Sequence, residues 1–130
     1  MVLVVVLAPV LAACAGSADK PEELNIFPTK FKDEILLQTP AILDDPTNIR
    51  GAFYSDPVLN PNGPINHYYS CVRFNPRGTN KQYLGSTDYI AHYFGGKLNQ
   101  FLPASKEQCG TAPYKPFPEL EKLCFGERCL

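Results

Sequence analysis

Residues 87–102 read TDYIAHYFGGKLNQFL, a stretch in which two runs of aromatic and branched residues flank the pair Gly95-Gly96. Such runs favour β-strands. Two consecutive glycines readily take the positive φ angles that a two-residue hairpin turn demands. The stretch therefore predicts an antiparallel hairpin in which Phe94 lies opposite Lys97.

The hairpin register also predicts which side chains are buried. Counting back from the turn, the expected pairs are Tyr93 with Leu98, His92 with Asn99, Ile90 with Phe101, and Tyr89 with Leu102. Side chains alternate between the two faces of a strand, so one face collects most of the large apolar groups. We expect this face to be buried, and it carries Tyr89, Ala91, Tyr93, Leu98 and Leu102.

Further strands precede the hairpin. Runs with a period of two, bounded by Asn, Pro and Gly, occur at 51–58 and 65–74, and with 87–94 and 97–102 they make four expected antiparallel strands. The tail 112–120 alternates Pro with aromatic residues. We expect it to pack in extended form across the sheet, and the alternative is that it serves as a ligand for a partner protein.

A helix is expected from Thr29 onward. Thr29 is a candidate N-cap, acidic residues occupy the first turns, and Phe31 and Ile35 lie one turn apart. Pro40 should kink or end this helix, and residues 44–48, DDPTN, read as a turn. The predicted fold class is α+β, with one N-terminal helix packed on an antiparallel β-meander of about four strands, stapled by disulfides.

The N-terminal stretch predicts an address rather than an element of the fold. Residues 2–13 are twelve uncharged, mostly apolar positions. They are too few for a transmembrane helix, which needs about twenty, but they suit the apolar region of a secretory signal. Leu11-Ala12-Ala13-Cys14 matches the bacterial lipobox, in which the cysteine sulfur receives a diacylglycerol and cleavage leaves that cysteine first. The alternatives are a buried strand or an ordinary signal cut elsewhere.

This pattern divides the chain into three parts. We expect a lipoprotein signal peptide at 1–13, a lipidated flexible tether at 14–24 and a single α+β domain at 25–130. Ala15 is not the aspartate that marks inner-membrane retention in enteric bacteria. The expected location is therefore the cell envelope, where the lipid anchors the protein to the outer membrane facing the periplasm.

The remaining cysteines form an even set. Removing the lipidated Cys14 from five leaves four, in a compartment that permits oxidation, and four cysteines allow three pairings. A rival use is a metal site of two cysteines and a histidine, but the chain has no second paired-cysteine knuckle and its histidines are remote in sequence. We therefore expect no metal. The disulfides we favour are Cys71 with Cys109 and Cys124 with Cys129, because the near pair would form before distant partners meet.

The overall charge argues against a nucleic-acid binder. Twelve basic and thirteen acidic side chains leave a formal net charge of −1. Within 46–106, however, six basic residues stand against two acidic ones. One interpretation is a basic sheet beside an acidic N-terminal segment; the other is a docking surface for an anionic partner. The candidate interaction surface comprises Arg50, Arg73, Arg77, Lys81 and Lys97.

No set of residues specifies a reaction. His67 and His92 fall on different expected strands, and we interpret both as surface or edge residues. Asp56 and Asp88 stand alone, whereas the carboxylates of hydrolytic enzymes work in pairs. We therefore expect no catalytic activity and no cofactor.

Five stretches of the chain combine distinctively: DPTNIR at 45–50, CVRFN at 71–75, LNQF at 98–101, EQCG at 107–110 and PFPELE at 116–121. Together they resemble a family of small alphaproteobacterial lipoproteins without an assigned activity. The resemblance covers most of the chain after the lipobox. It implies an envelope location, and it implies no catalytic residue, cofactor or substrate.

The sequence thus predicts a lipid-anchored cell-envelope protein with a small interaction or structural domain that faces the periplasm. Its expected partners are the membrane, through the lipid, and an envelope protein of unknown identity. The alternative is a small-ligand binding module on an aromatic sheet face. A concave pocket would favour that alternative and a filled face would count against it. The tyrosines concerned are Tyr54, Tyr68, Tyr69, Tyr89 and Tyr93.

Overall fold

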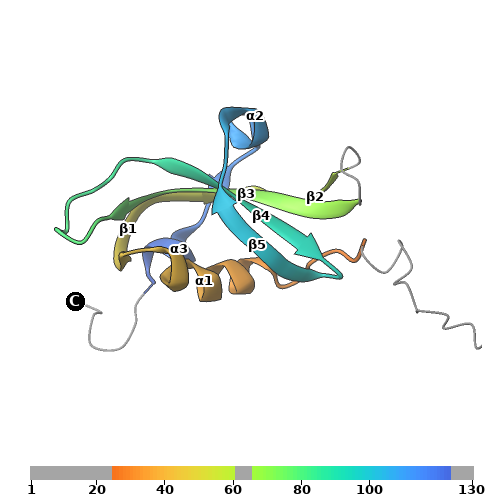
Figure 1. Cartoon of the computed structure of the whole chain (residues 1–130), viewed down its shortest axis with the longest axis horizontal. Coiled ribbons are helices and arrows are strands. Elements are labelled where there is room, and N and C mark those ends of the chain that lie inside the picture. The colour runs from red at the N-terminus through yellow and green to blue at the C-terminus, as the bar shows by residue number, and fades with distance from the viewer. Residues whose placement is uncertain (1–24, 61–65, 124–130) are drawn as a thin grey trace, which may run out of the picture.

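The computed structural model describes residues 25–60 and 66–123. A twisted antiparallel sheet lies between a long helix on one face and a single helical turn on the other (Figure 1). In chain order the elements are α1 (Phe31–Ile42), β1 (Asp45–Tyr54), β2 (Val58–Asn60), β3 (His67–Arg77), β4 (Thr87–Phe94), β5 (Lys97–Pro103), α2 (Lys106–Cys109), β6 (Lys115–Pro116) and α3 (Pro118–Glu121).

The sheet has the strand order β5-β4-β3-β1-β6, with β2 paired to β3 beside β1. The central strand, β3, has 11 residues, so one of its edges accommodates both β1 and β2. A helix with an antiparallel, disulfide-stapled sheet confirms the predicted fold class in outline. The described part of the chain holds six strands rather than about four. The two unexpected strands, β2 and β6, have three and two residues, too few for a periodic pattern to show.

The larger core lies between α1, α3 and the sheet. Its fully buried side chains include Ile35 of α1, Phe74 of β3, Tyr93 of β4, and Phe117 and Leu120 near the C-terminal end of the described chain. These residues come from four separate segments, so the core joins α1, near the start of the described chain, to residues near its end. Burial of large apolar side chains such as these contributes roughly 1.5–3 kcal/mol each.

The helix differs from its prediction at both ends. Lys30, not Thr29, is the N-cap, and no side chain caps the helix. Pro28 takes part instead, because its carbonyl accepts a hydrogen bond from the Phe31 amide at 3.1 Å. Pro40 lies inside the helix without ending it. The preceding residue, Thr39, donates its hydroxyl to a backbone carbonyl one turn back at 2.7 Å. The burial of Thr39, together with the packing of the α1 face that meets the sheet, stabilises the helix by more than the loss of one backbone hydrogen bond at proline destabilises it.

The hairpin confirms the predicted turn, but its register holds for only two pairs. Phe94 lies opposite Lys97 and Tyr93 opposite Leu98, with positive φ at both turn glycines. A bulge then shifts the ladder by one residue, so the expected pairing of His92 with Asn99 and those beyond it were wrong. The observed pairs are His92 with Gln100, Ala91 with Phe101, Ile90 with Leu102, and Tyr89 with Pro103.

The bulge changes which side chain of β5 enters the core. One extra residue reverses the alternation of faces beyond it. Phe101 is consequently buried, and Leu102, which we expected to be buried, is 47% exposed. Tyr93 and Ala91 are fully buried as predicted, and Tyr89 and Leu98 pack against the core.

The expected turn at 44–48 is an irregular start to β1. Asp45 already pairs with Arg77 of β3, and its carboxylate accepts hydrogen bonds from the amide of Thr47 at 3.0 Å and from its hydroxyl at 2.6 Å. Asn48 has a φ of 55°. The local turn chemistry is therefore present, but the neighbouring strand absorbs it as a bulge.

The C-terminal segment is extended up to Phe117, as predicted, but it adds the edge strand β6 instead of crossing the sheet, and residues from Pro118 onward are helical. Lys115 and Pro116 pair with β1, and the Phe117 amide donates to the Ala52 carbonyl at 2.8 Å. Phe117 is fully buried, and the single turn α3 follows it. Pro suits these positions because it is tolerated in edge strands and at the start of helices.

Candidate functional site

Alternation along β3 and β4 creates a second, distinct face of the sheet. The side chains that point away from α1 are His67, Tyr69, Cys71 and Arg73 of β3, and Asp88, Ile90, His92 and Phe94 of β4. A small core forms here from Cys71, Ile90 and Cys109, with Tyr69, Ala104, Ala112 and Tyr114 packed around it. We call this side of the sheet, with α2 and the segment that follows it, the α2 face.

A disulfide between Cys71 and Cys109 fastens α2 to the central strand. It confirms one of the two predicted pairings; the other cysteines, Cys14, Cys124 and Cys129, lie outside the described residues. The turn is also closed by a capping box. The Ser105 amide donates to Gln108 Oε1 at 2.9 Å, and the Gln108 amide donates to Ser105 Oγ at 3.3 Å. A helix of four residues is thereby held in place at both ends.

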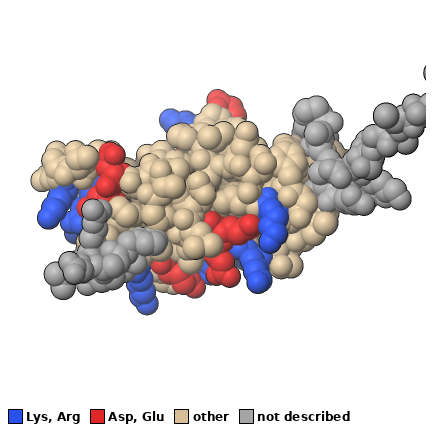
Figure 2. Space-filling view, turned by 60° about the horizontal axis from the view of Figure 1, so that its bottom comes forward, with Lys and Arg blue, Asp and Glu red and all other residues tan. Residues whose placement is uncertain are grey.

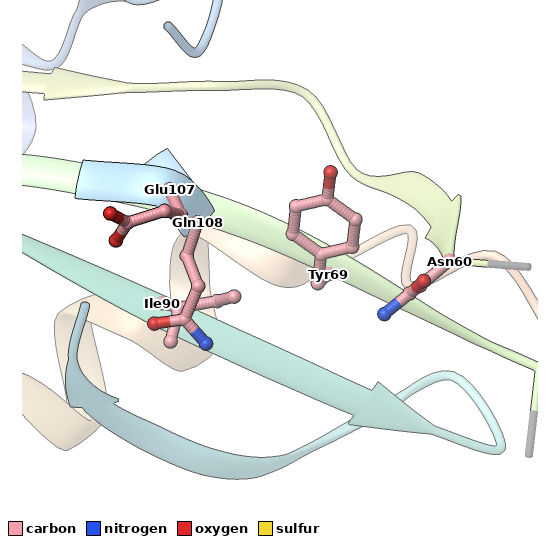
Figure 3. Close-up of a pocket in the computed structure, with 5 residues that line it drawn as sticks. All are labelled: Asn60, Tyr69, Ile90, Glu107 and Gln108. Atoms are coloured by element: carbon pink, nitrogen blue, oxygen red, sulfur yellow. The ribbon is translucent and has the colours of Figure 1, made fainter. Parts of the chain in front are cut away.

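Three hollows flank α2 on this face. The first, about 150 Å³, is lined by Asn60, Tyr69, Ile90, Glu107 and Gln108 (Figure 3). The second, about 220 Å³, shares Tyr69, Glu107 and Gln108 and extends beneath residues 111–113 toward the junction of β1 and β2. The third, about 490 Å³, is lined by Arg73, Ser86, Thr87, Asp88, Ala104 and Lys106.

The third hollow contains an internal ion pair. Arg73 donates to both carboxylate oxygens of Asp88, from Nε at 2.6 Å and from one terminal nitrogen at 3.1 Å, and this hydrogen bonding raises the pKa of the guanidinium. The same guanidinium lies 4.2 Å from the ring centre of Tyr114. Burial raises the pKa of the Tyr114 hydroxyl. Arg73 is therefore a fixed part of this wall rather than a free cation.

The structure brings the two histidines together. His67 Nε2 and His92 Nδ1 are 2.9 Å apart, and the His67 ring stacks on Phe94 with a centroid separation of 4.7 Å. His67 is buried, because the unexpected strand β2 places Asn60 opposite it. Our interpretation of His67 as a surface or edge residue was wrong for this reason; His92 is half-buried.

Burial and proximity also alter the acid–base behaviour of His92. Burial, and secondarily the nearby imidazole of His67, lowers the pKa of His92. A hydrogen bond between two imidazoles needs one nitrogen to donate and the other to accept. If both imidazoles were protonated to the cationic form, no acceptor would remain and two positive charges would lie side by side.

The five predicted basic residues do not form one surface. Arg77 binds Asp45 at 2.8 Å, and Arg50 lies 4.2 Å from the ring centre of Tyr83, which pairs with Arg77, so the structure gathers these two arginines near one end of β3. Lys81 is exposed in the following loop. Lys97 is exposed at the β4–β5 turn, at the other end of the sheet from Arg77, and Arg73 lies on the α2 face.

The five tyrosines likewise divide between the two faces. Tyr93 is fully buried on the α1 side, where its hydroxyl lies 2.7 Å from Ser70 Oγ, and three more pack against the same core, namely Tyr54, Tyr68 and Tyr89. Tyr69 alone is on the α2 face. The tyrosine set is thus mainly core structure, and only one member lines a hollow.

Sequence reasoning missed the residues that α2 contributes. Glu107 and Gln108 line the first two hollows, and Lys106 lines the third. One signal was present in the sequence, since Ser105 followed three residues later by Gln108 matches the capping-box pattern. The disulfide places this turn so that it lines the same hollows as Tyr69, and no local pattern reveals that bond.

Other classes of site find no counterpart in the described residues. Within 25–60 and 66–123, no three His, Cys, Asp or Glu side chains gather as a metal site would require. The helices of the same segments lack the combined length and apolarity needed to cross a bilayer. Comparison of the chain with protein family models, with curated proteins and with solved structures returns no match.

Proposed function

We propose that this protein is a lipid-anchored protein of the cell envelope that faces the periplasm from the outer membrane and binds a protein partner through the α2 face. The lipobox at Cys14 and the resemblance to small alphaproteobacterial lipoproteins support the location. The disulfide within the domain is consistent with an oxidising compartment. The proposal includes no catalytic activity and no cofactor.

The observation that carries the binding role is the ring of hollows around a disulfide-fastened helical turn. A single turn of four residues has little stability of its own. Here one covalent bond and one capping box hold it over the sheet, with exposed Lys106, Glu107 and Gln108 beside concave surface. Fixing such a turn in advance lowers the ordering cost of binding.

The lining of the two smaller hollows indicates the chemistry of the partner. Asp56 and Glu107 contribute carboxylates there, and no Lys or Arg is among the residues that line them. Asp56 is ion-paired with Lys115. Glu107 is exposed and makes no ion pair with the described residues. We infer a partner segment that is neutral or basic and that places a donor group beside Glu107 and the Tyr69 hydroxyl.

The location is tested by the mass of the mature protein extracted from membranes. We expect a chain that begins at Cys14, carries acyl groups, and is lighter by about four hydrogens for two disulfides. An unmodified chain that begins at Met1 would remove the basis for the proposed location.

The binding role is tested by placing a photo-crosslinking residue at Glu107 in cells. The matched control is Gln38, a similarly exposed position on α1. We expect a discrete crosslinked product from position 107 and none from position 38, and Glu107→Lys should weaken capture of the same partner. Products that are the same from both positions would contradict the proposed face.

A small-ligand binding module is the second candidate, on a changed surface. Four of the five tyrosines proposed for it pack into the α1-side core. The third hollow on the α2 face, at about 490 Å³, falls within the usual range of roughly 300–1,000 Å³ for ligand sites. Thermal-shift measurements with anionic and neutral small molecules would test it, with Lys106→Ala as the variant that should abolish any stabilisation.

A further inference from the structure

We propose that the end of the domain where the tether begins rests against the lipid bilayer. This inference depends on the lipid anchor of the proposed function and adds the surface that meets the membrane. We define the tether end by its exposed apolar side chains and the adjoining turn, which are Ile26, Phe27, Leu59, Gly96 and Lys97.

Contacts within the domain hold these apolar side chains together while leaving them exposed. Ile26 packs against the turn glycine Gly96, whose ideal Cβ position lies 3.0 Å from Ile26 Cγ2. Phe27 meets the ring of Tyr68 edge to face at 5.4 Å. Leu59 lies opposite Tyr68 in the β2–β3 ladder. Ile26, Phe27 and Leu59 remain 51%, 45% and 41% exposed, so each has surface available for an apolar partner.

The position of this end makes the bilayer its occupant. The described chain starts at Asn25 beside the β4–β5 turn, at one end of the long axis of the molecule (Figure 1). Ten residues lie between Cys14 and Asn25, and the eleven steps from one to the other span at most about 40 Å. A tethered surface meets the membrane at an effective concentration on the order of mM, so a small apolar patch is enough to keep it in contact with the bilayer.

Charge supports this end over the α1 side. Lys30 and Lys97 are exposed at or near the tether end, against one exposed carboxylate, Asp33, in the first turn of α1. The carboxylate of Glu34 is turned to the Leu98 amide, with 3.2 Å from each oxygen. The α1 side shows acidic side chains among the basic ones (Figure 2), including those of α3. Carboxylates weaken contact with an anionic lipid surface, whereas lysines strengthen it by about 1 kcal/mol each.

The test exploits the absence of tryptophan from the chain. Phe27→Trp introduces a single fluorescent reporter at the tether end, and Ile26→Trp provides a second. Leu84→Trp is the matched control in the β3–β4 loop at the far end, and Leu37→Trp reports on the α1 side; these leucines are 67% and 78% exposed. The lipidated proteins are placed in vesicles of phosphatidylethanolamine and phosphatidylglycerol, with or without brominated acyl chains.

We expect brominated lipid to quench the tether-end reporters, with a fractional loss of emission at least roughly twofold larger than at either control position, and a blue-shifted spectrum. Unchanged thermal midpoints would establish that each variant is folded. Equal quenching at Leu84→Trp or Leu37→Trp, or no quenching at the tether end, would overturn the inference. Occupation of the patch by the tether or by a second copy would give the second of these results.

Failure of the lipid anchor would look different. Protein without acyl groups would not float with vesicles in a density gradient, which would overturn the proposed location. Protein that floats with vesicles while its tether-end reporters stay unquenched would overturn only the bilayer contact.

Discussion

The disulfide between Cys71 and Cys109 should supply a large share of the stability of the domain. The two cysteines are 38 residues apart in the sequence. For a closed loop of this size, the loss of chain entropy in the unfolded state is about 13 cal/mol/K, which corresponds to about 3.9 kcal/mol at 25 °C. A domain of roughly 100 residues has a total stability of about 5–15 kcal/mol. The double variant Cys71→Ala, Cys109→Ala should therefore lose roughly a quarter or more of it.

Urea denaturation of the mature protein, followed by circular dichroism, measures this loss directly. A loss of about 3.9 kcal/mol should lower the thermal midpoint by at least about 15 °C in a domain of this size. Hydrogen exchange should accelerate first at the α2 amides, since the bond fastens that turn to β3.

The control is the double variant Cys124→Ala, Cys129→Ala. It removes the other predicted disulfide, which would enclose a much shorter loop. It should cost less, because the entropic effect grows with loop length. A loss below about 1 kcal/mol in the Cys71 and Cys109 variant, with unchanged α2 exchange, would refute the reasoning.

Three further predictions concern single side chains. Because burial and a neighbouring imidazole lower the pKa of His92, the folded state binds its proton more weakly than the unfolded state. The stability that neutral His92 allows is therefore fully present above the unfolded pKa of about 6.5, and it is lost as pH falls through the folded pKa. His92→Gln should flatten the dependence of unfolding free energy on pH between about pH 7 and 5 in urea titrations. Asp88→Asn should cost about 1–2 kcal/mol by calorimetry, since it weakens two charge-assisted hydrogen bonds to an Arg73 side chain that is 35% exposed. Gly96→Ala should cost roughly 1–2 kcal/mol, because its φ is 77° and the added methyl would press on Ile26, and unchanged urea midpoints would contradict this.

The hairpin shows how far local pattern determines the fold. Two glycines fixed the turn and the first two pairs, because those depend on backbone angles that few other residues adopt. The bulge followed from competition for the core. Phe101 fills space beside Tyr89, with ring centroids 5.4 Å apart, and a regular register would have put Leu102 there instead. No pattern within one strand reveals which of two adjacent apolar residues packs better.

The candidate site was less predictable because it is built from tertiary contacts. The Cys71–Cys109 pairing was one of three that an even set of four cysteines allows, and we favoured it because the near pair would form first. The meeting of His67 with His92 was not predictable, since it requires the register between β3 and β4 and the three-residue strand β2 that covers them. Sequence periodicity identifies strands but leaves their partners open.

Alternation along β3 links these observations to the proposed role. Even-numbered residues from Tyr68 to Phe74 face α1 and are committed to the main core, so substitutions there trade directly against stability. Odd-numbered residues carry the disulfide, the ion pair and the hollows on the α2 face. The tether end is a third surface, at the end of the long axis rather than on either face (Figure 1). Contact with a membrane there leaves the α2 face open to a partner, and variants of Glu107 and Phe27 should affect partner capture and lipid contact independently.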